Sequence, residues 1–218
     1  MQEIPDEFIG WLQRDLTHFV SLVEEGSCAT GDPIQKGYTD CDLTIVVRHD
    51  VPNEMRAVYA RLAKSRIENA YRFGVRHLDE FLCGDALNDL SLKYRSKAIL
   101  GEDVVSAKTA PNREVALTIG TEGLLALRAR TERNWLNLSH WSAKYSQTKN
   151  YDIFKFFFVY SAAKIYGETG RYPVTRAEAA ALIEPREKAD AILRVVNDIC
   201  SATIEDQKEA LEAMMGDY

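Results

Sequence analysis

The first third of the chain switches between helical and extended patterns of hydrophobic residues. Apolar positions from Phe8 to Leu16 recur at the spacing of one helix face, which predicts a first helix. Two short apolar runs follow at 19–23 and 43–47, and each predicts a buried strand. A loop that contains glycine and proline separates them, and a longer helical pattern begins at Pro52.

The stretch 73–82 predicts a third strand, which completes a strand–helix–strand start typical of a small mixed sheet. Beyond Ala86 the strand signals end. Apolar positions at helical spacing predict long helices over 117–141 and 151–166, and a last helix that begins at Pro185. The chain is therefore predicted to belong to the α/β (α+β) class, with a mixed-sheet part followed by an all-helical part.

Composition is that of an ordinary soluble globular protein. The chain has 218 residues, of which 46% are hydrophobic and 28% are charged. It is long enough to bury a core without disulfide or metal crosslinks. Its net charge of -6 argues against a surface that coats nucleic acid. No apolar run approaches the roughly 20 residues of a membrane helix. The first residues lack a basic segment followed by an apolar one, so we expect a cytoplasmic protein without a membrane partner.

The four cysteines, Cys28, Cys41, Cys83 and Cys200, are scattered and form no pair at metal-ligand spacing. The histidines are equally scattered, so the pattern indicates no zinc site. We expect four free thiols in a reducing compartment.

Small residues and acids gather around the first two predicted strands. Gly26 and Ser27 follow the first strand, and Asp40 and Asp42 stand one residue apart at the head of the second. Because residues i and i+2 of a strand share a face, both carboxylates would project together toward the Gly-Ser turn. A glycine turn admits phosphate oxygens, and carboxylates hold Mg²⁺ while the phosphates supply further ligands. The pattern indicates a phosphoryl-transfer site.

This turn, its spacing to the acid pair and the apolar run that follows resemble the signature of the nucleotidyltransferase superfamily, which includes DNA polymerase beta. The segments 88–92 and 99–103, followed by helices, are similar to the aminoglycoside adenylyltransferase branch. The resemblance implies a nucleotidyltransferase domain over residues 1–108 and a helical substrate-binding domain over residues 109–218. It also implies Mg²⁺ as cofactor and ATP, or another nucleoside triphosphate, as co-substrate.

On this resemblance, Asp40 and Asp42 would be catalytic and would bind Mg²⁺, while Ser27 would contact the triphosphate. Lysines on or beside the helical part could also reach the triphosphate, and Lys155 is the one we select. The residues expected to contact the nucleotide are Gly26, Ser27, Thr39 and Lys155.

A third carboxylate on a neighbouring strand usually completes such a site, and here the chain departs from the family pattern. Asp79 is the expected third catalytic and metal-binding acid. Glu80, which would point to the opposite face of the strand, and the more distant Asp89 stay open as alternatives. A solvated strand edge would also explain Asp79 and Glu80.

The expected activity is Mg²⁺-dependent transfer of a nucleoside monophosphate, AMP from ATP, to a hydroxyl of a small molecule such as an aminoglycoside, with release of pyrophosphate. Two alternatives stay open. One is the same chemistry on a protein or a tRNA, and the other is a nucleotide-sensing module without turnover.

Overall fold

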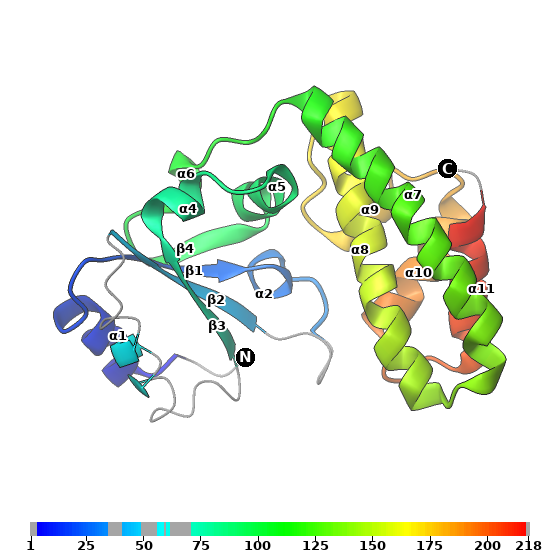
Figure 1. The fold of residues 1–218 in the computed structure, drawn as a ribbon, viewed down its shortest axis with the longest axis horizontal. Coiled ribbons are helices and arrows are strands. Elements are labelled where there is room, and N and C mark those ends of the chain that lie inside the picture. Colours follow the sequence, from blue (N-terminus) through cyan, green and yellow to red (C-terminus); the bar gives the residue numbers. More distant parts are fainter. Residues whose placement is uncertain (1–3, 35–40, 49–55, 59, 62–70, 217–218) are drawn as a thin grey trace. The chain divides into compact units, whose positions relative to one another are not determined.

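The computed structural model describes residues 4–34, 41–48, 56–58, 60–61 and 71–216. The chain forms two compact units (Figure 1). Unit 1 consists of Met1–Thr30 and Asp40–Ala110, and unit 2 consists of Gly31–Thr39 and Pro111–Tyr218. The fold is α+β, with one mixed sheet and many helices. Within the described ranges, no helix is long and apolar enough to cross a membrane.

Unit 1 is built on a four-stranded sheet with the order β3-β2-β1-β4. β1 runs antiparallel to β2 and to β4, whereas β2 and β3 are parallel. The elements of unit 1 are α1 (Asp6–Arg14), β1 (Phe19–Glu25), α2 (Ser27–Thr30), β2 (Cys41–Val47), β3 (Tyr71–His77), α4 (Leu78–Leu82), α5 (Ala86–Tyr94), β4 (Ser96–Gly101) and α6 (Val104–Ala107). The predicted first helix and first two strands are confirmed.

Helices cover both faces of the sheet, so β1 and β2 are buried on both sides (Figure 1). On one face, α1 packs Phe8 and Leu12 against the β2 residues Leu43 and Ile45. On the other face, α4, α5 and α6 pack against β1 and β2 around Phe81. The centre of the sheet is therefore shielded from solvent on both faces.

Two sequence predictions in unit 1 are wrong. The stretch 78–82 is the helix α4 rather than the end of a strand, because the His77 ring caps it by accepting a hydrogen bond from the Asp79 amide. Its apolar residues at 78, 81 and 82 also fit helical spacing. The second error is β4, an edge strand beyond Ala86 with alternating exposure that the sequence analysis missed. Residues 56–58 and 60–61 are helical, and the rest of the helix predicted from Pro52 lies outside the described residues.

Unit 2 is helical. Its elements are α7 (Arg113–Asn137), the short 3₁₀ helix η2 (Leu138–His140), α8 (Ala143–Thr169), α9 (Arg176–Ala180), α10 (Arg186–Asn197) and α11 (Ile204–Met215). The two long helices come close at Gly120 and Gly123, where a Cβ atom would collide with α8. The apolar faces of α7, α8, α10 and α11 share one core. The long helices and α10 follow the predicted pattern, and α11 is an additional helix.

The chain between β1 and β2 belongs in part to unit 2. Asp32 is 5% exposed and accepts a hydrogen bond from the Arg176 amide at 3.0 Å. The Arg176 guanidinium donates to the Pro33 carbonyl at 2.9 Å and lies 3.7 Å from Oδ1 of Asp32. A buried ion pair thus ties the start of this loop to α9.

Candidate active site at the Gly26 turn

The two halves of the predicted motif meet in unit 1. Gly26 has a φ of +65°, a left-handed conformation that side chains other than glycine adopt at a cost, and its amide donates to the Arg95 carbonyl at 2.8 Å. A Cβ placed on Gly26 would have one neighbour, Oδ2 of Asp42, at 4.0 Å. The Asp42 carboxylate therefore lies beside the turn. Ser27 begins α2 directly after the turn and is 5% exposed.

Sequence reasoning missed a second carboxylate at this place. Glu25, the last residue of β1, lies directly opposite Asp42 in the antiparallel β1–β2 pair. Opposed residues of such a pair project to the same face with their Cβ atoms about 5 Å apart. The sequence signal for this carboxylate was the pair Glu24 and Glu25 at the end of β1. Because adjacent strand residues point to opposite faces, one of the two shares the face of Asp42.

The charge of Glu25 is held in an environment that disfavours it. Burial is the main cause that raises the pKa of the Glu25 carboxyl, and the nearby Asp42 charge raises it further. A hydrogen bond from the Thr44 hydroxyl and the charges of Arg76 and Lys108 act in the opposite direction. Oε1 of Glu25 is buried and accepts no hydrogen bond from the described part of the chain.

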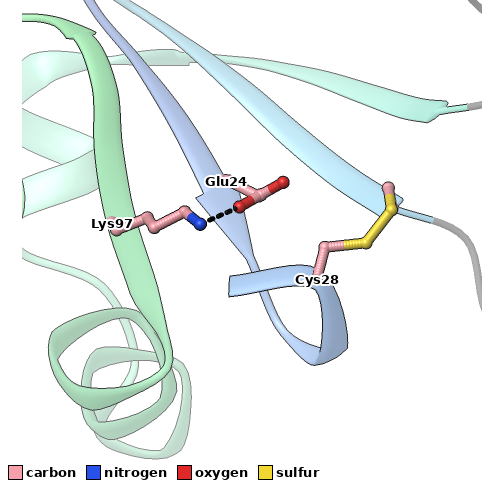
Figure 2. The surroundings of a disulfide bond; sticks show 4 residues. Glu24, Cys28 and Lys97 are labelled. Carbon is pink, nitrogen blue, oxygen red and sulfur yellow. Dashed lines mark ion pairs between the residues drawn. A yellow bond between two sulfur atoms is a disulfide. The ribbon is translucent and has the colours of Figure 1, made fainter. Parts of the chain in front are cut away.

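A disulfide joins the two halves of the motif from the opposite face of β2. Cys28 of α2 and Cys41 of β2 are bonded, with their Cα atoms 5.5 Å apart (Figure 2). The expectation of four free thiols is therefore wrong for this pair, whereas Cys83 is a free thiol and Cys200 is also outside any disulfide. Because Cys41 immediately precedes Asp42, the crosslink fixes the head of β2 to the turn.

Asp79 does not lie near Asp42. In the parallel β2–β3 pair, Asp42 lies opposite Arg72 at one end and Val47 lies opposite His77 at the other. Asp79 follows His77, so about 17 Å of strand, at roughly 3.3 Å per residue, separates the two acids. The Asp79 side chain is 86% exposed, with Oδ2 3.6 Å from Nδ1 of His77. The structure does not bring the expected third acid to the site.

The other two candidates for the third acid also have different surroundings. Glu80 is an exposed residue of α4, next to Asp79. Asp89 lies on α5, where Oδ1 is 2.6 Å from the buried Nζ of Lys108 and accepts from the Gly84 amide at 3.0 Å. Lys108 also donates to the Phe81 carbonyl. Asp89 therefore serves as the counter-ion of Lys108.

The remaining predicted site residues divide between the units. Asp40 and Thr39 lie outside the described residues. Lys155 is a half-buried residue of α8, in unit 2. Within the described ranges, no group of three or more histidine, cysteine, aspartate or glutamate side chains could hold a metal ion. The acids brought together are Asp42 and Glu25.

No protein-family model matches the chain, and no curated protein matches it.

Proposed function

We propose that this protein is a Mg²⁺-dependent nucleotidyltransferase of the superfamily that its motif resembles. The observation that carries the proposal is the meeting of the Gly26 turn with the Asp42 carboxylate, 4.0 Å from the position of a Cβ on Gly26. The glycine leaves space for a phosphate oxygen beside a carboxylate that can hold a cation. The disulfide between Cys28 and Cys41 supports this geometry from the opposite face of β2.

Two carboxylates of the described site could serve as ligands of a divalent cation. Asp42 and Glu25 share one face, and a buried oxygen of Glu25 accepts no hydrogen bond from the described residues. Bound Mg²⁺ would neutralise phosphate charge in the transition state. Asp42 would hold the cation beside the turn, and Ser27 would contact the phosphates.

The proposed reaction transfers AMP from ATP to a hydroxyl group. The acceptor oxygen forms a bond to the α-phosphorus, and the bond from that phosphorus to the oxygen bridging to the β-phosphate breaks. Pyrophosphate leaves, and the hydroxyl proton passes to solvent. We propose a small polyhydroxylated cation such as an aminoglycoside as the acceptor, because the net charge of -6 favours a cationic substrate.

The test is incubation of the full chain with each α-labelled nucleoside triphosphate, Mg²⁺ and a panel of aminoglycosides, protein and tRNA. The proposal predicts label on an aminoglycoside and release of pyrophosphate, both lost in Asp42→Asn. Transfer of label to tRNA or protein would reassign the acceptor. No transfer to any acceptor, with no pyrophosphate release, would contradict the enzymatic proposal.

One observation favours a second candidate, a nucleotide-binding module without turnover. Asp79 lies at the other end of the β2–β3 pair from Asp42, so the acid expected from the neighbouring strand is missing. Nucleotide binding without pyrophosphate release would single out this candidate.

A further inference from the structure

Unit 2 contains a cavity of about 220 Å³, lined by side chains of α7, α8 and α11, three helices that share one core (Figure 1). Four of the lining residues from α7 recur at i, i+3, i+4 and i+7, so they lie on one helix face. These four residues are Thr121, Leu124, Leu125 and Arg128. From α8, Phe157 and Lys164 are seven residues apart and also share a face. The cavity is formed where these two faces meet Met214 of α11.

Apolar side chains make up most of the lining. Leu127, Phe157 and Met214 line the cavity and belong to the buried core of unit 2. Leu125 also lines it but is 64% exposed, so a large apolar side chain lies beside the cavity in contact with water. A concave site with an apolar lining and a few polar groups is the usual form of a small-molecule site. The lining therefore indicates a ligand with an apolar body.

The charged groups that line the cavity are positive. Arg128 and Lys164 supply two cations, and none of the described lining residues is acidic. The chain as a whole has a net charge of -6, so this positive lining is a local feature. Cationic side chains beside an apolar surface favour a ligand that carries negative charge.

Lys164 is the cation best placed to bind a ligand. Its side chain is 30% exposed, and its described partner, Oε1 of Glu168, lies 3.8 Å away, beyond hydrogen-bond distance. Glu168 is itself half-exposed, and such i,i+4 ion pairs contribute little to stability. Arg128 is engaged more closely, since its Nε donates to Oε1 of Glu132 at 3.3 Å. A carboxylate that enters the cavity would therefore find its hydrogen-bond donor in Lys164.

We propose that this cavity binds a small amphipathic anion, an aliphatic chain that ends in a carboxylate. The chain would contact Leu125, Phe157 and Met214, and the carboxylate would accept a hydrogen bond from Lys164. One ammonium group matches one negative charge. All of the lining residues belong to unit 2, so the inference goes beyond the proposed function and does not depend on it.

The test is calorimetric titration of the full chain with decanoate below its micelle-forming concentration, and with decan-1-ol and decylammonium, which have the same chain with a neutral or a positive end. We expect decanoate to bind about tenfold more tightly than decan-1-ol, since a hydrogen bond to a charged group is worth at least this factor. Lys164→Met should abolish that preference, because methionine keeps much of the apolar stem and lacks the charge. The matched control is Lys144→Met, at an exposed lysine of the same helix, which should bind decanoate as the wild type does.

Three results would overturn the proposal. They are no saturable binding of decanoate by the wild-type chain, binding of decan-1-ol or decylammonium at least as tight as that of decanoate, and equal losses of affinity in Lys164→Met and Lys144→Met. Thermal unfolding checks that each variant folds. If Lys164→Met does not fold, Leu125→Asp replaces it, since this exposed position tolerates a charge; a raised Kd for decanoate is expected from like-charge repulsion, and a wild-type Kd would contradict the site. The titration contains no nucleotide or Mg²⁺, so its outcome is separate from that of the proposed function.

Discussion

Acids lie at both ends of the parallel β2–β3 pair, and the two ends differ in burial and in the groups that surround the acids. At the head of β2, Asp42 lies opposite a largely buried Glu25 and beside the Gly26 turn. At the far end, the Asp79 side chain is 86% exposed to water in the first turn of α4. An exposed acid beside a helix start has a structural explanation. At the head of β2, burial and the neighbouring Asp42 carboxylate both disfavour the charge of Glu25.

The largest expected contrast is in activity. Asp42→Asn should lower kcat by about a thousandfold or more, because loss of a metal ligand removes several kcal/mol of transition-state stabilisation. Asp79→Asn should leave kcat near the wild-type value, since this side chain is exposed at the other end of β2. Initial rates of pyrophosphate release measure both variants. Equal losses of kcat in the two variants would contradict the distinction between the two ends of β2.

The second contrast concerns the crosslink at the head of β2. Replacing Cys28 and Cys41 by serine should lower the free energy of unfolding by about 3 kcal/mol, the chain-entropy value for a loop of this size. The matched control is Cys83→Ser, at an exposed free thiol. Urea unfolding with and without reductant measures the difference, and insensitivity of the wild-type chain to reductant would contradict the pairing.

The Gly26 turn gives a smaller effect on stability. Gly26→Ala should cost about 1–2 kcal/mol, because an alanine is strained at a φ of +65°. Gly26→Asn should cost less, since asparagine tolerates this conformation. Both side chains would occupy the space beside Asp42, so activity should fall in both. An active Gly26→Asn variant would show that phosphates do not need this space.

The smallest effect is a gain in stability at neutral pH. Because the pKa of Glu25 is raised in the folded protein, ionising this carboxyl costs folding free energy as the pH rises above its ordinary value of 4.5. Glu25→Gln should therefore raise the melting temperature at neutral pH, by a margin that shrinks as the pH falls toward 4.5. The charged groups that act on Glu25 are Asp42, Arg76 and Lys108. A lower melting temperature at neutral pH would instead indicate a structural ion pair.

Local sequence patterns were sufficient for the first two strands and for the turn between them. The apolar runs of β1 and β2 are short, and this length favours strands over buried helices. The glycine that follows β1 has the left-handed backbone that a tight turn requires. The long helices of unit 2 were equally legible from their spacing. These elements depend on residues close together in the chain.

The errors concern features that depend on distant residues. Leu78 and Phe81 fit helical spacing, and the His77 cap, which the sequence alone does not reveal, begins the helix at this point. The position of Glu25 opposite Asp42 follows from the register of β1 against β2. The alternation of apolar and polar residues along each strand does not by itself determine that register. The Cys28–Cys41 bond likewise requires the turn and the strand to be placed before the two sulfurs can be matched.

The most direct test of the account is a crystal structure of the full chain with a non-hydrolysable ATP analogue and Mn²⁺, in which anomalous scattering locates the metal. The account predicts a Mn²⁺ ion bound by Asp42, with the triphosphate over Gly26 and Ser27. A nucleotide bound elsewhere, or a metal held at Asp79 instead of Asp42, would contradict it.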